Sequence, residues 1–296
     1  MNFQPLTLAE RELYNKYYHA TGSPASELTF ANLMAWQEVY QTKYAIIDKY
    51  FCMIINRHGR RMAILPLVDG HLNYISDGVI TKLQRYFIEH FHQDCWYAIV
   101  TPQHLRLLDD NVEVVEQVET RDDFDYVYLR EKLTTLSGRK LQAKRNHVSH
   151  FKREYPDYQY FAIGDDFISK YHGAIIELTN RIPEEQKAIL YMLEHFSALQ
   201  LSGGYIIVDN HLVAFTIGEV IDSMNMAVVH IEKANLDYHA SFQIINQEFV
   251  AHCLQDAMYI NREQDLGIEG LRKTKLSYHP DHFIEKSDII LTGGKV

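Results

Sequence analysis

The sequence YIIVDNHLVAFTIGEVIDSMNMAVVHI, residues 205–231, contains three apolar segments separated by short polar stretches. Segments of this length and composition predict β-strands, at residues 205–208, 212–220 and 225–231. Asp209 and Asn210 join the first two segments, and this dipeptide favours a tight turn. The stretch therefore predicts an antiparallel meander, and the pattern after it predicts a helix at 242–254.

The first half of the chain contains the same order of elements. Helical patterns at 7–21 and 28–40 precede three short apolar segments, a further helical pattern and another predicted strand. Thr7 and Glu10 have the spacing of a capping box at the first helix. The second half also has two helical patterns before its meander, at 166–179 and 183–201. Two domains of similar architecture are therefore predicted, which agrees with the length of 296 residues.

Composition argues against several classes of protein. The chain has 29 Lys or Arg against 39 Asp or Glu, a net charge of −10 that argues against general binding of nucleic acid. Its three cysteines, Cys52, Cys95 and Cys253, are widely separated, which fits neither a disulfide framework nor a CxxC metal site. The N-terminal residues lack a signal-peptide pattern, and no apolar run is long enough to span a membrane. We therefore expect a cytoplasmic protein, and the scattered histidines predict no metal site.

Residues 130–153 are strongly basic. They include eight Lys or Arg and a single Glu, a net charge of +7, so the rest of the chain carries −17. A helical pattern at 137–154, with Ser137 as its predicted N-cap, concentrates basic side chains on its first turns. Such positions suit phosphates and carboxylates, and the candidate anion-binding residues are Arg139, Lys140, Lys144, Arg145 and His147. The alternative is a helix whose charges pair with the acidic domains around it.

A second candidate site lies in YINREQDLGIEGLRKTKLSYHP, residues 259–280. Charged groups of both signs follow the end of a predicted strand, which is a common composition of active sites. Two glycines in a predicted turn would let the backbone approach a ligand closely. The candidate residues are Asn261, Arg262, Glu263, Asp265, Gly267, Gly270, Arg272 and Lys275. The alternative is a glycine-rich turn with surface charges.

Glu232 follows the third strand of the predicted meander. A carboxylate at this position can act as a general base toward an amine, directly or through water. The alternative is a surface carboxylate that forms a salt bridge. The chain contains no P-loop, no GxGxxG after a strand and no HExxH, so none of these phosphate-binding or zinc motifs points to its function.

Two stretches resemble an uncharacterised bacterial protein family: LREKLTTLSGRKLQAKRNHVSHFKREYPDY (129–158) and NREQDLGIEGLRKTKLSYHP (261–280). That family is related to the cytosolic C-terminal domain of phosphatidylglycerol lysyltransferases. The resemblance covers nearly the whole chain and implies two tandem GNAT-like (acyl-CoA N-acyltransferase-like) domains, as in the Fem aminoacyl-tRNA-dependent ligases. The implied fold class is α+β, with a mixed, mostly antiparallel sheet and flanking helices in each domain. The expected parts are an N-terminal domain at 1–136, a basic connecting helix at 137–158 and a C-terminal domain with the active site at 159–296.

The resemblance implies transfer of an acyl or aminoacyl group, from acyl-CoA or aminoacyl-tRNA, to an amine or hydroxyl such as that of an anionic lipid headgroup. We expect Glu232, Glu263 and Asp265 at the reacting centre, with Asn261 and Arg262 orienting the substrate. The basic segment would bind tRNA, an anionic lipid headgroup or the phosphates of coenzyme A. A lipid acceptor would place the protein at the inner face of the membrane.

The choice of donor depends on one loop. Ordinary GNAT proteins bind acyl-CoA at a glycine-containing turn after their fourth strand, whereas the corresponding stretch here, NLDYHASF (235–242), has no glycine. Backbone N–H groups would then have difficulty closing around a pyrophosphate, which makes acyl-CoA the less favoured donor. The alternative function is a catalytically silent protein that holds RNA or an anionic lipid through the basic helix.

Overall fold

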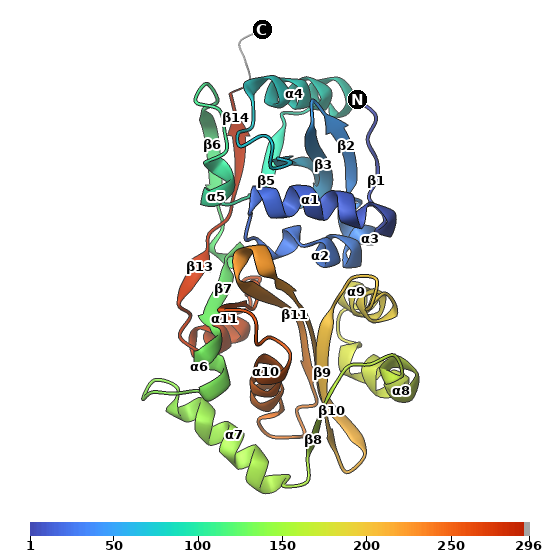
Figure 1. Ribbon diagram of the computed structural model, residues 1–296, viewed down its shortest axis with the longest axis vertical. Helices are drawn as coiled ribbons and strands as arrows, with labels where there is room; N and C mark the ends of the chain where they lie inside the picture. Colours follow the sequence, from blue (N-terminus) through green and yellow to red (C-terminus); the bar gives the residue numbers. More distant parts are fainter. Residues whose placement is uncertain (293–296) are drawn as a thin grey trace. The chain divides into compact units, whose positions relative to one another are not determined.

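A computed structural model describes residues 1–292 of the chain. The chain divides into two compact units (Figure 1): unit 1 is Met1–Phe124 together with the segment that begins at Ile284, and unit 2 is Asp125–Phe283. Each unit contains one seven-stranded sheet with helices packed against it. Within residues 1–292, no helix combines the length and the apolar composition needed to cross a bilayer.

Unit 1 is built on a mostly antiparallel sheet. Its strands, in their order across the sheet, are β1 Gln4–Pro5, β2 Lys43–Ile47, β3 Tyr50–Arg57, β4 Arg60–Leu67, β5 Trp96–Val100, β14 Ser287–Leu291 and β6 Val114–Glu119. Only β4 and β5 pair in parallel among the strands described. The helices are α1 Arg11–Thr21, α2 Phe30–Ala35, α3 Gln37–Tyr40, α4 Asp77–Phe91 and α5 Pro102–Leu105, with short 3-10 turns η1 Leu8–Glu10, η2 Ser26–Leu28 and η3 Arg121–Asp123.

Helices cover both faces of the sheet of unit 1. α4 buries Leu83 and Phe87 in a cluster that includes Cys52 of β3. The next residue toward the N-terminus, Phe51, points to the opposite face because side chains alternate along a strand. There its ring lies 5.4 Å from that of Tyr14 on α1. The helical segment before α1 begins with the predicted capping box, formed by Thr7 and Glu10.

Unit 2 has a second sheet of the same kind. Its strands, in order, are β13 His282–Ile284, β7 Asp125–Leu129, β12 Tyr259–Asn261, β11 Met226–Ala234, β10 His211–Ile221, β9 Ser202–Val208 and β8 Gln159–Ala162. From β7 to β8 the neighbours pair antiparallel, except that β11 and β12 are parallel. The helices are α6 Arg130–Thr135, α7 Gln142–Glu154, α8 Phe167–Thr179, α9 Pro183–Glu194, α10 Ser241–His252 and α11 Glu269–Leu276, with the 3-10 turn η4 Asp222–Met224.

The predicted meander is present as β9, β10 and β11. His211 pairs with Val208 across a two-residue turn. Asp209 and Asn210 adopt φ values of 48° and 64° in that turn, as a two-residue hairpin requires. Each unit then follows its meander with a helix and a strand parallel to the last meander strand: α4 and β5 in unit 1, α10 and β12 in unit 2. The prediction of two domains with similar architecture and a mostly antiparallel α+β fold is confirmed.

The boundaries of the units differ from the predicted 1–136 and 159–296. β7 pairs with β12, so unit 2 begins at Asp125. β14 pairs with β5 and β6, so the C-terminal strand completes the sheet of unit 1. Both memberships depend on pairing between strands that are far apart in the chain, and composition along the chain does not mark such pairing.

The basic helix is shorter than the predicted 137–158. α7 covers Gln142–Glu154, and Ser137 does not cap it. Leu136 and Gly138 have φ values of 49° and 90°, so the chain turns between α6 and α7 instead of entering a helix at Ser137. Arg139 and Lys140 therefore lie in a loop, and only the later basic residues lie on the helix.

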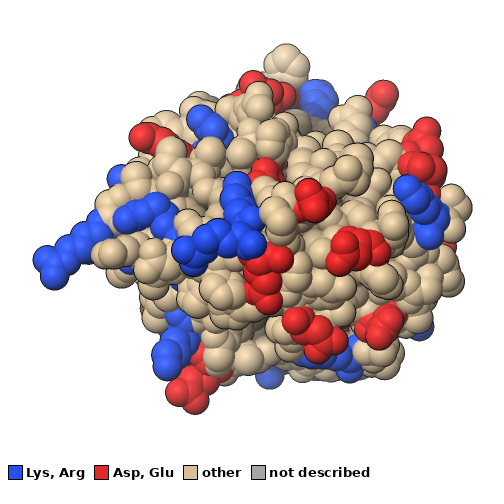
Figure 2. Space-filling model, turned by 90° about the horizontal axis from the view of Figure 1, so that it is seen from below, with Lys and Arg blue, Asp and Glu red and all other residues tan. Residues whose placement is uncertain are grey.

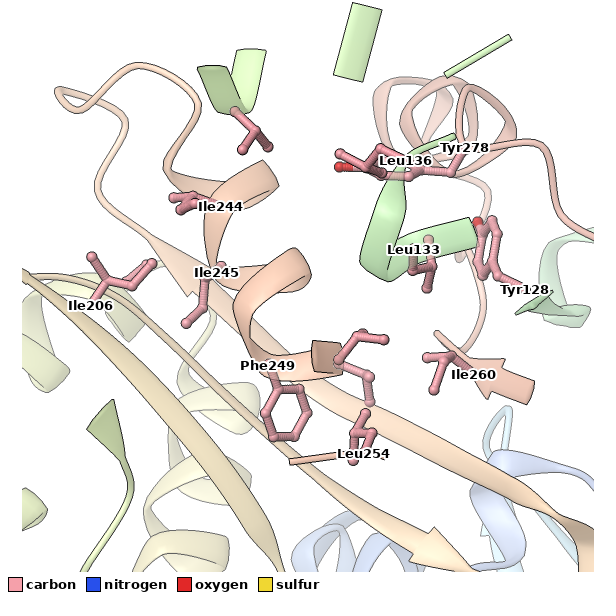
Figure 3. Close-up of a cluster of buried hydrophobic side chains, with 14 of the residues drawn as sticks. Tyr128, Leu133, Leu136, Ile206, Ile244, Ile245, Phe249, Leu254, Ile260 and Tyr278 are labelled. Atoms are coloured by element: carbon pink, nitrogen blue, oxygen red, sulfur yellow. The ribbon is translucent and has the colours of Figure 1, made fainter. Parts of the chain in front are cut away.

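The core of unit 2 lies beneath α10. This helix lies across one face of the sheet with α6 and α7 beside it, while α8 and α9 lie on the other face (Figure 1). Ile245 and Phe249 of α10 point toward the sheet (Figure 3). Leu133 of α6 packs in the same cluster as Tyr128 and Tyr278. The apolar core thus holds two tyrosine rings in place beside the polar groups described next.

Candidate active site

Strands β11 and β12 separate within the sheet of unit 2. They pair at only three positions, from Met226 with Tyr259 to Val228 with Asn261. β11 then continues to Ala234, whereas β12 ends and the chain enters the loop 262–268. Polar side chains from the second half of β11 meet side chains from this loop, and together they form the candidate active site.

The first component of this site is an ion pair between Arg262 and Glu232. Arg262 Nε and Nη2 donate to the same oxygen, Glu232 Oε2, at 3.0 and 2.6 Å. The guanidinium lies over two tyrosine rings, 4.9 Å from the centroid of Tyr278 and 5.8 Å from that of Tyr128. Arg262 is only 8% exposed. Its Nη1 and the other carboxylate oxygen, Glu232 Oε1, are buried without a hydrogen-bond partner among residues 1–292.

Lys144 of α7 adds a second cation. Its ammonium lies 4.4 Å from the centroid of the Tyr278 ring, the same ring that Arg262 contacts. Burial and the nearby charge of Arg262 lower the pKa of Lys144. No carboxylate of the described chain forms an ion pair with it. Two cations and one carboxylate, Glu232, therefore surround Tyr278, and this excess of positive charge suits an anionic group.

His230 joins two further carboxylates. Its Nδ1 bonds to Glu263 Oε1 at 2.8 Å and its Nε2 to Glu219 Oε1 at 2.9 Å, and the imidazole has no exposed surface. Burial lowers the pKa of His230, but hydrogen bonds and charge from the two carboxylates outweigh it and raise the pKa to about 10. The ring is therefore an imidazolium at neutral pH, and it balances the charge of Glu263.

Glu263 is also held by its backbone. Its φ is 55°, a left-handed value that is uncommon for a residue with a side chain. The N–H of Glu263 donates to Asn261 Oδ1 at 2.8 Å, and Asn261 Nδ2 donates to Asp125 at 2.9 Å. These bonds fix the direction in which the chain leaves β12.

Asp265 anchors the same loop. It is fully buried and accepts hydrogen bonds from Tyr126 Oη at 2.5 Å, from two nitrogens of Arg272 at 2.8 Å each and from the Gly267 N–H at 2.9 Å. Although burial opposes its charge, these bonds lower the pKa of Asp265 to about 2. Both carboxylate oxygens are engaged, so the geometry gives Asp265 a role in positioning the loop.

Lys275 holds the loop from α11. Its Nζ donates to the backbone carbonyls of Arg262, at 2.6 Å, and of Gln264. Burial, reinforced by the charge of Arg262, lowers the pKa of Lys275 to about 8. Of the residues that the motif 259–280 suggested, Arg262 and Glu263 bond to side chains of β11. Asp265, Arg272 and Lys275 instead stabilise the loop that carries these two residues.

The two glycines of the motif differ. Gly267 has a φ of 72° in the loop, whereas Gly270 lies in α11, where an added Cβ would meet nothing within 4 Å. We expect Gly270→Ala to raise the free energy of unfolding by about 0.5 kcal/mol and Gly267→Ala to lower it by about 1 kcal/mol. Urea unfolding measures both values. Loss of ligand binding in Gly270→Ala would favour the close backbone approach expected from the sequence.

Basic side chains also line a pocket beside Tyr278. This pocket has a volume of about 380 Å³, and Lys132, Arg139, Lys140 and Asp281 contribute to its wall together with Tyr278 itself. Figure 2 shows Lys and Arg side chains gathered toward the side of the molecule where α7 and the preceding loop lie, with Asp and Glu more frequent on the other side. The pocket thus adds a positively charged region next to the Lys144 and Arg262 cations.

Arg145 has a structural contact within this region. Its Nη1 donates to the backbone carbonyls of Leu136 and of Gly138, the latter at 2.7 Å. The guanidinium therefore fixes the turn between α6 and α7, and it supports the loop that carries Arg139 and Lys140.

His147 faces a different depression. Its Nδ1 lies 3.3 Å from His239 Nε2, and His150 and Arg153 line the same depression. Burial, together with the charges of His239 and Lys144, lowers the pKa of His147. Even so, no group of three His, Cys, Asp or Glu side chains within residues 1–292 is arranged to hold a metal ion. Neither a hydrogen bond nor an ion pair of the described residues joins His147 to the Glu232–Arg262 pair.

Sequence reasoning did not select several residues of the site. Glu219 was not selected, although a charged residue in an apolar strand was an available signal, whereas His230 lies in the stretch His230–Lys233 that contains the candidate Glu232. Tyr128 and Tyr278 have no local signal, because a buried aromatic residue resembles any other core residue.

Comparison with known proteins identifies the family. The family model described as "Phosphatidylglycerol lysyltransferase, C-terminal" matches residues 20–289. The chain belongs to this family. Membership places it among proteins related to acyl and aminoacyl transferases, as the resemblance implied.

Solved structures agree with this family. A conserved protein of unknown function from Bacteroides thetaiotaomicron is 32% identical, with a TM-score of 0.86, over 99% of this chain and 100% of the other. L-PGS from Bacillus licheniformis is 12% identical with a TM-score of 0.63, over 96% of this chain and 92% of the other. A GNAT-family acetyltransferase from Colwellia psychrerythraea is 10% identical with a TM-score of 0.53, over 99% and 100%. The last two show the fold, and they confirm the GNAT-like architecture.

Proposed function

We propose that this chain transfers an aminoacyl group from aminoacyl-tRNA to an amine or hydroxyl of an acceptor such as an anionic lipid headgroup. One observation carries the proposal: Lys144 and Arg262 share the ring of Tyr278 beside a pocket lined by basic residues. Both the tRNA end and an anionic headgroup present phosphates that suit these cations. The enzyme would work in the cytoplasm, where its donor is found, and would meet a lipid acceptor at the inner membrane face.

The loop between β11 and α10 favours aminoacyl-tRNA over acyl-CoA. It contains no glycine, and the N–H groups of Ser241 and Ile244 at the start of α10 already donate to carbonyls of the loop. His147 of α7 also contacts this loop, with its Nδ1 3.3 Å from His239 Nε2, and the ring of Tyr155, the residue after α7, lies 5.4 Å from that of Tyr238. The N–H groups of Ser241 and Ile244 are therefore not available to bind a pyrophosphate in the manner of an ordinary GNAT protein.

In the proposed reaction, the ester bond between the amino acid and the tRNA ribose is replaced, at the same carbonyl carbon, by an amide or ester bond to the acceptor. The acceptor nitrogen or oxygen attacks that carbon, and the bond to the tRNA ribose oxygen breaks. The acceptor loses a proton, and the ribose oxygen gains one. Negative charge develops on the carbonyl oxygen during this step, and Lys144 and Arg262 supply fixed positive charge that can stabilise it.

Transfer from labelled donors tests the proposal. The purified chain is incubated with tRNA charged with radiolabelled amino acids, together with phosphatidylglycerol vesicles or a small primary amine. We expect label to appear in the lipid or in the amine, whereas acetyl-CoA consumption stays at the level of the enzyme-free control. Consumption of acetyl-CoA without aminoacyl transfer would contradict the proposed donor. Binding of tRNA or vesicles with no transfer would favour the catalytically silent alternative.

A further inference from the structure

The Glu232–Arg262 ion pair leaves one donor and one acceptor unmatched. Because both Arg262 nitrogens that bind Glu232 share the oxygen Oε2, the other oxygen, Oε1, and the other nitrogen, Nη1, have no partner within residues 1–292. Arg262 is more than nine-tenths buried, and the side chain of Glu232 is 14% exposed. Buried polar groups in proteins are nearly always hydrogen-bonded, since an unmatched one costs its full desolvation penalty. A ligand that satisfies both atoms explains their retention.

The unmatched atoms define the chemistry of that ligand. One ion pair thus offers one unmatched acceptor and one unmatched donor, which is complementary to a group that carries both a donor and an acceptor. We propose that this pair binds the aminoacyl end of the donor substrate, with Glu232 Oε1 accepting from the α-ammonium and Arg262 Nη1 donating to the carbonyl oxygen. This inference rests on the proposed function and deepens it, because a plain acyl thioester has a carbonyl but no adjacent ammonium.

Neighbouring groups fit the rest of such a substrate. Tyr278 contacts Arg262 and also lines the pocket that contains Arg139 and Lys140. A substrate with its phosphate in this pocket and its aminoacyl end at Arg262 would pass Tyr278, which borders both. Lys144, which also contacts Tyr278, adds positive charge near the same end.

Puromycin provides the probe for the test. It carries an aminoacyl group with a free α-amine on an adenosine-like nucleoside, and its hydroxy analogue has OH in place of that amine. Isothermal titration with both compounds measures how far the protein prefers the ammonium. We expect the wild-type protein to bind puromycin at least about tenfold more tightly than the hydroxy analogue, as a charge-assisted hydrogen bond implies.

Two variants assign the preference to Glu232. Glu232→Gln is expected to bind both compounds within about twofold, whereas Glu185→Gln keeps the wild-type preference. Glu185 is a matched control, because it forms an ion pair with Lys233, the neighbour of Glu232 on β11. Circular dichroism checks that each variant is folded. The comparison of puromycin with its hydroxy analogue on the wild-type protein tests the inference even if a variant does not fold.

Three outcomes would overturn the inference: equal binding of the two compounds by the wild type, no binding of either, or an unchanged preference in Glu232→Gln. Failure of the proposed function has a different signature. A wild-type protein that prefers puromycin but transfers no label from aminoacyl-tRNA would retain the ammonium-binding pair and lack the transferase activity.

Discussion

Replacing His230 with alanine is expected to lower the free energy of unfolding by about 3–5 kcal/mol, the range for breaking a buried charge network. The imidazolium is fully buried and bonds to Glu263 at 2.8 Å and to Glu219 at 2.9 Å. Its removal leaves two carboxylates close together without the charge that lies between them. Urea unfolding at pH 7, followed by circular dichroism and extrapolated linearly, measures the change.

The pH dependence of this loss has a definite sign. The pKa of His230 rises from 6.5 to about 10 on folding. A raised pKa means that the folded state binds the proton more tightly, so the stabilisation is complete below pH 6.5 and is lost as the pH approaches 10. The difference in unfolding free energy between wild type and His230→Ala should therefore be largest near pH 6.5 and should become smaller as the pH rises toward 10.

An exposed histidine provides the control. His172 is an exposed residue of α8 in the same unit. We expect His172→Ala to change the unfolding free energy by less than about 0.5 kcal/mol at any pH between 6.5 and 10. If His230→Ala lost the same amount at both ends of the pH range, the stabilisation would come from packing and not from the imidazolium.

The elements of the fold were predictable where their signal is local. The apolar segments of the meander and the Asp209-Asn210 turn are properties of neighbouring residues, and the structure contains both. The membership of β7 and β14 depends on pairing with β12, β5 and β6, which are distant in the chain. The predicted helix start at Ser137 failed for a related reason: Arg145 bonds back to the carbonyl of Gly138 and stabilises a turn where the pattern favoured helix.

The candidate site was predictable in its residues more than in its arrangement. Position at a strand end selected Glu232 and Arg262, and the density of basic residues in a predicted helix selected Lys144, so the three came from different segments. That they meet around Tyr278 follows only from the tertiary packing of α7 and of the loop after β12. Burial also decides which charges remain available to a substrate. The buried Asp265 is paired with Arg272, whereas Lys144 is partly exposed.

Reversing the charge of Lys144 is expected to reduce kcat/KM for aminoacyl transfer by about 100-fold, equivalent to ~2.7 kcal/mol of transition-state stabilisation. Lys144→Glu replaces a cation with an anion over the Tyr278 ring, where Arg262 also lies. A glutamate there repels an anionic substrate and competes for the guanidinium of Arg262. Initial rates of label transfer at low ionic strength, where screening is weakest, measure the effect.

The fold should survive this substitution, because Lys144 is only partly buried and forms no ion pair with the described residues. Arg145 is a poor partner for a double substitution, since it holds the carbonyls of Leu136 and Gly138 and its loss would disturb the loop. Lys170→Glu is the matched control: Lys170 lies on α8 with its ammonium 5.0 Å from the ring of Tyr171. A fall in kcat/KM for both variants would indicate a general effect of net charge, whereas a fall for Lys144→Glu alone places the anionic substrate at Tyr278.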